Sequence, residues 1–266
     1  MQAKALEADV IPHRGSIIGM TRSACGRWLT LALCLAATSA MAGPPFVTDD
    51  PDPVDRGHAE VNAIYQEVRT SDGRAGALTG ELNQGCARET QCHVAVPLAF
   101  DRPDGGPSRT GVGDIELGVK FRFLHDEDSA WSAATYPTLT LPTGDESRGL
   151  GNGRTQLSLP VWVQRSAGPW NFDAGVAWLA NPAPDARDSW FAGLLAQRSF
   201  GDRLKLGAEV FRRSSVSQGV PASCGFNVGA IVNVALHQNL LASAGRGLSG
   251  VQTNRRSVFI AYQLEL

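Results

Sequence analysis

Apolar and polar positions alternate along much of the chain, most clearly in the segment from Ile115 to Phe123. Every second residue of that segment is apolar, and the residues between them are charged or glycine. Successive side chains of a β-strand point to opposite faces of its sheet, so the segment predicts a strand with one apolar and one polar face. The same alternation recurs along the chain, and no stretch after residue 42 shows a convincing helical period. The pattern therefore predicts an all-β fold.

The alternating segments predict twelve antiparallel strands. Most run for about ten to fourteen residues, whereas strands of soluble sheets usually have about five or six, and a tilted strand crosses a bilayer in about nine to eleven. Their length therefore favours a transmembrane β-barrel over a soluble sandwich. The predicted strands are 57–69, 75–86, 91–100, 112–124, 130–143, 155–167, 169–181, 188–200, 203–215, 224–237, 239–248 and 256–266.

The connections between these strands alternate between short and long. Outer-membrane barrels have short periplasmic turns and longer external loops, and an even strand number leaves both termini in the periplasm. The alternation therefore predicts an outer-membrane barrel. The short connections are 87–90, 125–129, 168, 201–202 and 238, and the longer ones are 70–74, 101–111, 144–154, 182–187, 216–223 and 249–255.

Charged residues stand within several predicted strands, on the polar side of the alternation. A barrel lumen accommodates such groups if opposite charges pair there. The residues that we expect to face the lumen are Asp114, Glu116, Lys120, Arg122, Asp173, Arg203, Lys205 and Glu209. Hydrocarbon offers no hydrogen-bond partner to an open sheet edge, so strand 57–69 must pair with strand 256–266. The strand number leaves two interpretations open, a conduit for solutes and a plugged structural barrel.

The N-terminus resembles an export signal. Arg22 and Arg27 precede an apolar stretch over 28–37, and the small-x-small sequence at 40–42 predicts cleavage after Ala42. The apolar stretch is short for a membrane anchor. The chain divides into an N-terminal extension and signal peptide (1–42), an extended periplasmic lead-in (43–56) and the barrel (57–266). Translation could start at Met1 or Met20.

The lead-in is rich in proline and aspartate. Asp49, Asp50 and Asp52 could together bind a cation, but no ligand-loop pattern follows them, which favours a solvated, turn-rich segment. Cys86 and Cys92 flank the predicted turn at 87–90, and export permits a disulfide between them; two free thiols remain an equal alternative. Cys224 would then be unpaired.

Charge and hydropathy exclude other classes. The net charge is -2, with both signs mixed along the chain, which gives no basic patch for nucleic acid. The mean hydropathy of -0.12 is too low for a bundle of membrane helices. A barrel tolerates that value, because only every second residue faces lipid.

Several segments resemble an outer-membrane family named after the meta pathway of phenol degradation, whose members are often described as transporters. The matching segments are Phe46–Pro51, Glu81–Gly85, Val94–Ala99, Gly113–Leu124 and Pro142–Gly153. The resemblance implies an outer-membrane barrel that passes small, often aromatic or apolar, compounds. It brings no catalytic residue and no cofactor.

The sequence offers little for catalysis. The histidines after residue 42 lack metal-ligand spacing to one another or to cysteine, so we expect no metal site. A membrane-embedded lipid hydrolase would need a serine beside a histidine, and His237 with Ser243 is only a loose pair. The glycine-rich Gly149–Gly153 lacks the lysine of a phosphate loop. We therefore expect a protein that is not an enzyme.

These observations predict a monomeric barrel in the outer membrane of a Gram-negative cell, in contact with membrane lipid. Its expected function is passage of small molecules of unknown identity. Two alternatives remain: a structural or adhesive barrel without transport, and a lipid hydrolase. Neither nucleic acid nor a cofactor is expected as a partner.

Overall fold

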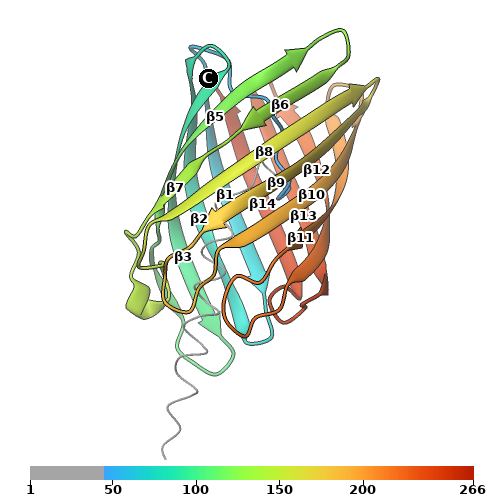
Figure 1. The fold of residues 1–266 in the computed structure, drawn as a ribbon. Helices are drawn as coiled ribbons and strands as arrows, with labels where there is room; N and C mark the ends of the chain where they lie inside the picture. The colour runs from blue at the N-terminus through green and yellow to red at the C-terminus, as the bar shows by residue number, and fades with distance from the viewer. Residues whose placement is uncertain (1–44) are drawn as a thin grey trace, which may run out of the picture.

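Fourteen strands form one antiparallel sheet in the computed structural model, which describes residues 45–266 (Figure 1). A short 3-10 helix, η2 (Glu146–Arg148), lies in one of the loops. The strands are β1 (Ala59–Arg69), β2 (Gly73–Ala87), β3 (Thr90–Pro103), β4 (Arg109–Val112), β5 (Ile115–Asp126), β6 (Trp131–Thr135), β7 (Thr138–Leu141), β8 (Gln156–Ala167), β9 (Trp170–Ala180), β10 (Ser189–Phe200), β11 (Leu204–Arg213), β12 (Ser223–Ala235), β13 (Gln238–Ser249) and β14 (Arg256–Glu265). The expected signal peptide and its cleavage after Ala42 lie outside the described residues.

Two of the barrel's strands are interrupted. β4 and β5 both pair with β3, and β6 and β7 both lie between β5 and β8. Pro137 stands in the second interruption and has no N–H to donate to a ladder, although its carbonyl accepts a hydrogen bond from the Val119 N–H. Counted as continuous strands, the sheet is the twelve-stranded barrel that the alternation predicted.

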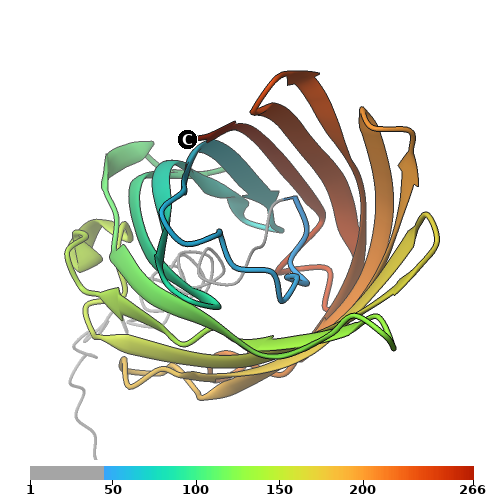
Figure 2. The ribbon, with the colours of Figure 1, turned by 90° about the horizontal axis from the view of Figure 1, so that it is seen from above.

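The first and last strands close the barrel. β1 pairs with β14 from Glu60↔Glu265 to Arg69↔Arg256, and the Leu266 N–H continues the ladder to the Ala59 carbonyl. The view along the barrel shows this closed wall (Figure 2). The predicted closure is confirmed, and with it the requirement that a lipid-facing sheet has no open edge.

The outer surface carries the apolar residues of the alternation. Leu117, Val119 and Phe121 on β5 remain more than 40% exposed, whereas Glu116 and Lys120 on the opposite face of the same strand are buried. Large side chains near strand ends, Trp131, Trp170, Trp190 and Phe200, are exposed as well. Residues 45–266 contain no helix long and apolar enough to cross a membrane.

The inner face is more mixed than the expected polar interior. Trp162, Ala177 and Phe191 form one buried apolar cluster on neighbouring strands. Ile64, Leu241, Phe259 and Ala261 form a second where the barrel closes. The lumen therefore combines apolar regions with buried charges.

Connections alternate at the two ends of the barrel. The short turns, which include the β5–β6 turn, lie at the same end as the C-terminus (upper end in Figure 1), and η2 and the longer loops lie at the other end. Glu89, Ala130 and His237 adopt positive φ in three of the short turns. The β1–β2 connection is shorter than predicted, because β2 already begins at Gly73.

The lead-in differs from its expected position. Its described part, from residue 45, does not extend away from the barrel into the periplasm but runs inside the lumen before β1 begins (Figure 2). Phe46, Thr48 and Asp49 are each at most 2% exposed. The physical reason is a set of charged and backbone contacts across the lumen.

Candidate functional site

A buried carboxylate on β11 holds the first part of the lead-in. Glu209 accepts hydrogen bonds from the backbone N–H groups of Val47 and Thr48, each at 2.9 Å, and from the Asn227 side-chain amide. Hydrogen bonds to a charged acceptor offset much of the cost of burying it. Glu209, expected to face the lumen, thus serves there as an anchor for the chain's own N-terminal segment.

Glycines on the inner face leave room for this segment. A Cβ at Gly207 would come within 2.7 Å of the Phe46 ring, and one at Gly229 within 3.0 Å. Ser243 on β13 donates a hydrogen bond to the carbonyl of Pro45. The absence of a side chain at these glycines therefore accommodates the lead-in.

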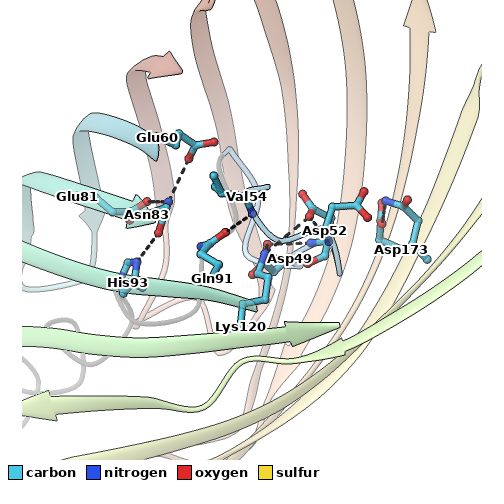
Figure 3. Close-up of polar contacts among 12 residues, drawn as sticks. Asp49, Asp52, Val54, Glu60, Glu81, Asn83, Gln91, His93, Lys120 and Asp173 are labelled. Carbon is cyan, nitrogen blue, oxygen red and sulfur yellow. Dashed lines mark hydrogen bonds and ion pairs between the residues drawn. The ribbon is translucent and has the colours of Figure 1, made fainter. Parts of the chain in front are cut away.

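The aspartates of the lead-in pair with basic residues of β5 (Figure 3). Lys120 Nζ lies 3.1 Å from Asp49 Oδ1 and 3.7 Å from Asp50 Oδ1, and both Lys120 and Asp49 are buried. The Arg122 guanidinium lies 2.7 Å from Asp52 Oδ1 and also pairs with Glu89 in the β2–β3 turn. The lead-in aspartates therefore pair with cationic side chains of the barrel, with Asp49 fully buried while Asp50 and Asp52 remain partly exposed.

Burial changes the acidity of the lead-in. Desolvation raises the pKa of Asp49 from 3.8 to about 6, although the Lys120 ammonium opposes the shift. Desolvation also raises the pKa of Asp52. The hydrogen bond from Arg122 lowers the pKa of Glu89. The Asp49 carboxylate is therefore the lead-in group whose charge depends most directly on its enclosed position.

The structure joins Cys86 and Cys92 in a disulfide, with Cα atoms 5.9 Å apart. The enclosed turn contacts the lead-in directly, because Gln91 Oε1 accepts a hydrogen bond from the Val54 N–H at 2.9 Å. Cys224 is a free cysteine and lies 2.9 Å from the Ser249 hydroxyl.

The remaining residues that we expected to face the lumen each have their own surroundings. Asp173 is buried and accepts a hydrogen bond from the Gln164 amide, while Lys205 is partly buried on β11. Asp114 accepts hydrogen bonds from the N–H groups of Gly144 and Asn152, so it also fixes a loop. Arg203 lies outside the strand predicted for it: it is exposed in the turn before β11, which begins at Leu204.

A polar network on β1, β2 and β3 was not predicted (Figure 3). The side-chain amides of Asn62 and Asn83 each donate to both the Glu60 and the Glu81 carboxylates, at 2.7 to 3.1 Å. His93 Nδ1 lies 2.8 Å from Asn83 Oδ1. These residues alternate with apolar ones along their strands. The alternation could therefore have placed them on the inner face of the barrel.

A cavity of about 220 Å³ lies between the lead-in and the longer loops. Glu81 and His93 of this network line the cavity, and Glu116 lines it beside them. Most of the other lining is apolar. The large apolar side chains around it are Phe46, Ile64, Phe100, Leu150, Phe211 and Phe259. A concave, mostly apolar space with a few convergent polar groups is the usual form of a small-molecule site.

Residues 45–262 match the profile of a family described as "Putative MetA-pathway of phenol degradation". The chain belongs to this family. The sequence resemblance is thereby confirmed.

Several solved structures share the fold of this protein. The COG4313 outer membrane channel from Pseudomonas putida F1 superposes with a TM-score of 0.70 and 16% sequence identity, over 85% of this chain and 100% of that chain. The KdgM porin gives a TM-score of 0.55 at 7% identity, over 77% of this chain and 98% of that one. The NanC porin gives 0.55 at 9%, over 78% and 100%. No curated protein matches the sequence.

Ser243 and His237, which the sequence offered as a loose hydrolase pair, contact different groups in this protein. Ser243 donates to Pro45, and His237 Nδ1 lies 3.6 Å from the Glu265 carboxylate. Among residues 45–266, no group of three or more His, Cys, Asp or Glu side chains could hold a metal ion.

Proposed function

We propose that this protein passes small apolar or aromatic molecules across the outer membrane of a Gram-negative cell. The observation that carries the proposal is the largely apolar cavity enclosed by a barrel whose outer face is itself apolar. Burying apolar surface contributes about 25 cal/mol per Å². A cavity lined by Phe46, Phe100 and Leu150 therefore favours an apolar solute over a sugar-like one.

The same features support the proposed location and assembly. The exposed apolar residues on the outside need lipid, which supports an outer-membrane position and contact with membrane lipid. The closed β1–β14 seam completes the barrel within one chain, which supports a monomer. Two of the solved structures of like fold are named as porins and one as a channel, which agrees with passage of a solute.

A plugged structural barrel is the second candidate. The docked lead-in favours it, because Asp49 and Lys120 neutralise each other inside the lumen and Glu209 fixes the backbone beside them. Transport requires that the lead-in moves or leaves a gap for the solute. The two candidates therefore differ in whether the docked segment can be displaced.

Uptake of an apolar probe separates the two candidates. Cells that produce the mature protein, shown to be folded by heat-modifiable gel migration, are compared with empty-vector cells for the rate at which N-phenyl-1-naphthylamine enters the outer membrane. We expect faster uptake with the protein and no comparable gain for a sugar in liposome swelling. Equal probe uptake with folded protein in the outer membrane would refute passage and leave the structural barrel.

A further inference from the structure

We propose that the carboxylates at the edge of the cavity bind the protonated amino group of an apolar molecule, with Glu116 as the principal acceptor. The inference rests on the proposed function and names the class of solute. It follows from the hydrogen-bond roles that the network imposes on His93.

The network fixes which atom of His93 carries a proton. Asn83 donates through its amide nitrogen to the Glu60 and Glu81 carboxylates, so its carbonyl oxygen is the atom that faces His93. An oxygen acceptor requires a donor, so His93 Nδ1 carries the proton of that 2.8 Å hydrogen bond. In a neutral imidazole the other nitrogen, Nε2, is then an acceptor.

His93 Nε2 has no hydrogen-bond partner although it is buried. The side chain is 4% exposed, and its Nε2 lies 3.3 Å from the Glu116 carboxylate. At 3.3 Å a lone pair opposite a carboxylate is unfavourable unless the imidazole takes up a second proton or a donor from a ligand lies beside the two atoms. A buried, unsatisfied acceptor of this kind costs about 1–3 kcal/mol. His93 Nε2 and Glu116 therefore form a site for a hydrogen-bond donor.

The carboxylates nearest His93 select a cationic donor. Glu81 also lines the cavity, and its Oε1 is held by the amides of Asn62 and Asn83, which are neutral. Lys120, the buried cation on the same strand as Glu116, pairs with the lead-in aspartates. An ammonium group satisfies several carboxylates at once and carries the opposite charge, which an alcohol does not.

The apolar lining sets the rest of the molecule. Phe100, Phe46 and Ile64 line the same cavity as the two glutamates, so a ligand with its amino group at Glu116 would bury a ring or short chain against them. The predicted ligand is thus an apolar primary amine and not a polyamine.

Binding to the full mature protein in detergent tests the proposal. The probes are three molecules of similar size: 2-phenylethylammonium, 2-phenylethanol and phenylacetate, titrated calorimetrically at neutral pH against protein and against empty micelles. We expect the ammonium to bind at least about tenfold more tightly than the alcohol, because hydrogen bonds to charged groups are the stronger ones. Phenylacetate should bind most weakly.

Variants assign the preference to the site. Glu116→Gln should bring the ammonium within about twofold of the alcohol and leave the alcohol unchanged, and Glu81→Gln should reduce the preference in part. Glu127→Gln, in the exposed β5–β6 turn, is the matched control and should bind like the wild type. Heat-modifiable migration establishes that each variant folds; if Glu116→Gln does not, the Glu81→Gln result decides.

The outcomes separate this inference from the proposed function. Equal binding of ammonium and alcohol to the wild type would overturn the amine site, as would an unchanged preference in the folded glutamate variants. Such a result would indicate that His93 carries both protons and satisfies Glu116 by itself. Uptake of the neutral naphthylamine probe would then still support passage. Conversely, amine binding that depends on Glu116, without any uptake, would leave the site valid and remove transport.

Discussion

Replacing Lys120 by methionine should release the lead-in from the lumen. The Lys120 and Asp49 side chains are buried together, with Nζ and Oδ1 3.1 Å apart. Methionine keeps much of the volume of lysine but leaves the Asp49 carboxylate in the lumen without its nearest cation. Breaking a buried pair by removing one partner costs about 3–5 kcal/mol. Displacement of the lead-in avoids that cost, because Asp49 then returns to water.

Protonation of Asp49 limits how much Lys120→Met can weaken docking of the lead-in. Asp49 can remain docked if it takes up a proton, and with a docked pKa of about 6 this costs only about 1.4 kcal/mol at neutral pH. We therefore expect the docking equilibrium constant to fall about tenfold, since about 1.4 kcal/mol is a factor of ten. The barrel wall should persist, because its ladders do not involve the Lys120 side chain.

Single-channel conductance in planar bilayers measures the effect, together with protease cleavage of the released segment. Lys120→Met should raise the conductance and expose residues 45–56 to cleavage. Adding Asp49→Asn to that variant removes the unpaired charge and should restore much of the docking. Arg203→Met, in the exposed turn before β11, makes the same change of charge and serves as the control. Wild-type conductance and protection in folded Lys120→Met would refute the reasoning.

Three further predictions concern the same segment. Gly207→Val should weaken docking by about 1–3 kcal/mol by overpacking against Phe46, and conductance should rise; Gly80→Val, where a Cβ meets open space, is the control and should not differ from the wild type. Cys86→Ser should lower the free energy of unfolding by about 2 kcal/mol, measured as a lower urea midpoint of the heat-modifiable form; an unchanged midpoint contradicts this. Acidification should tighten docking, because the docked pKa of Asp49 lies near 6 against 3.8 when released, so the stabilisation is present at low pH and lost as pH rises through 6. Between pH 7.5 and 5 the gain is about tenfold, and conductance that rises towards pH 5 would contradict it.

The fold could be predicted from the sequence because its cause is local. Alternation at period two decides which face of β5 meets lipid, and a slip of one residue would turn Phe121 inward and Lys120 outward. The closure of β1 on β14 followed from the absence of hydrogen-bond partners in hydrocarbon. These inferences needed no knowledge of long-range contacts.

The docked lead-in could not be predicted in the same way, because its partners are remote in sequence. Glu209 lies 162 residues from Val47, and Lys120 lies 71 residues from Asp49. The alternation along the strands placed Lys120 and Glu209 inside the barrel. It could not show whether these side chains would contact water, a solute or the chain itself. Arg203 had the same parity, yet β11 begins only at Leu204, so its side chain lies in a turn.

The composition of the lead-in did contain a signal of its position, because an extended segment inside a lumen must satisfy its N–H groups without a ladder. Prolines 45, 51 and 53 have no N–H to satisfy. The aspartates accept from the chain itself, with Asp50 N–H donating to Asp49 and Asp52 N–H to Asp50. The donors of Val47, Thr48 and Val54 find the carboxylate of Glu209 and the amide oxygen of Gln91 on the wall. Proline and aspartate thus reduce the number of donors that the lumen must accept, which a solvated segment would not need, since water satisfies every donor there.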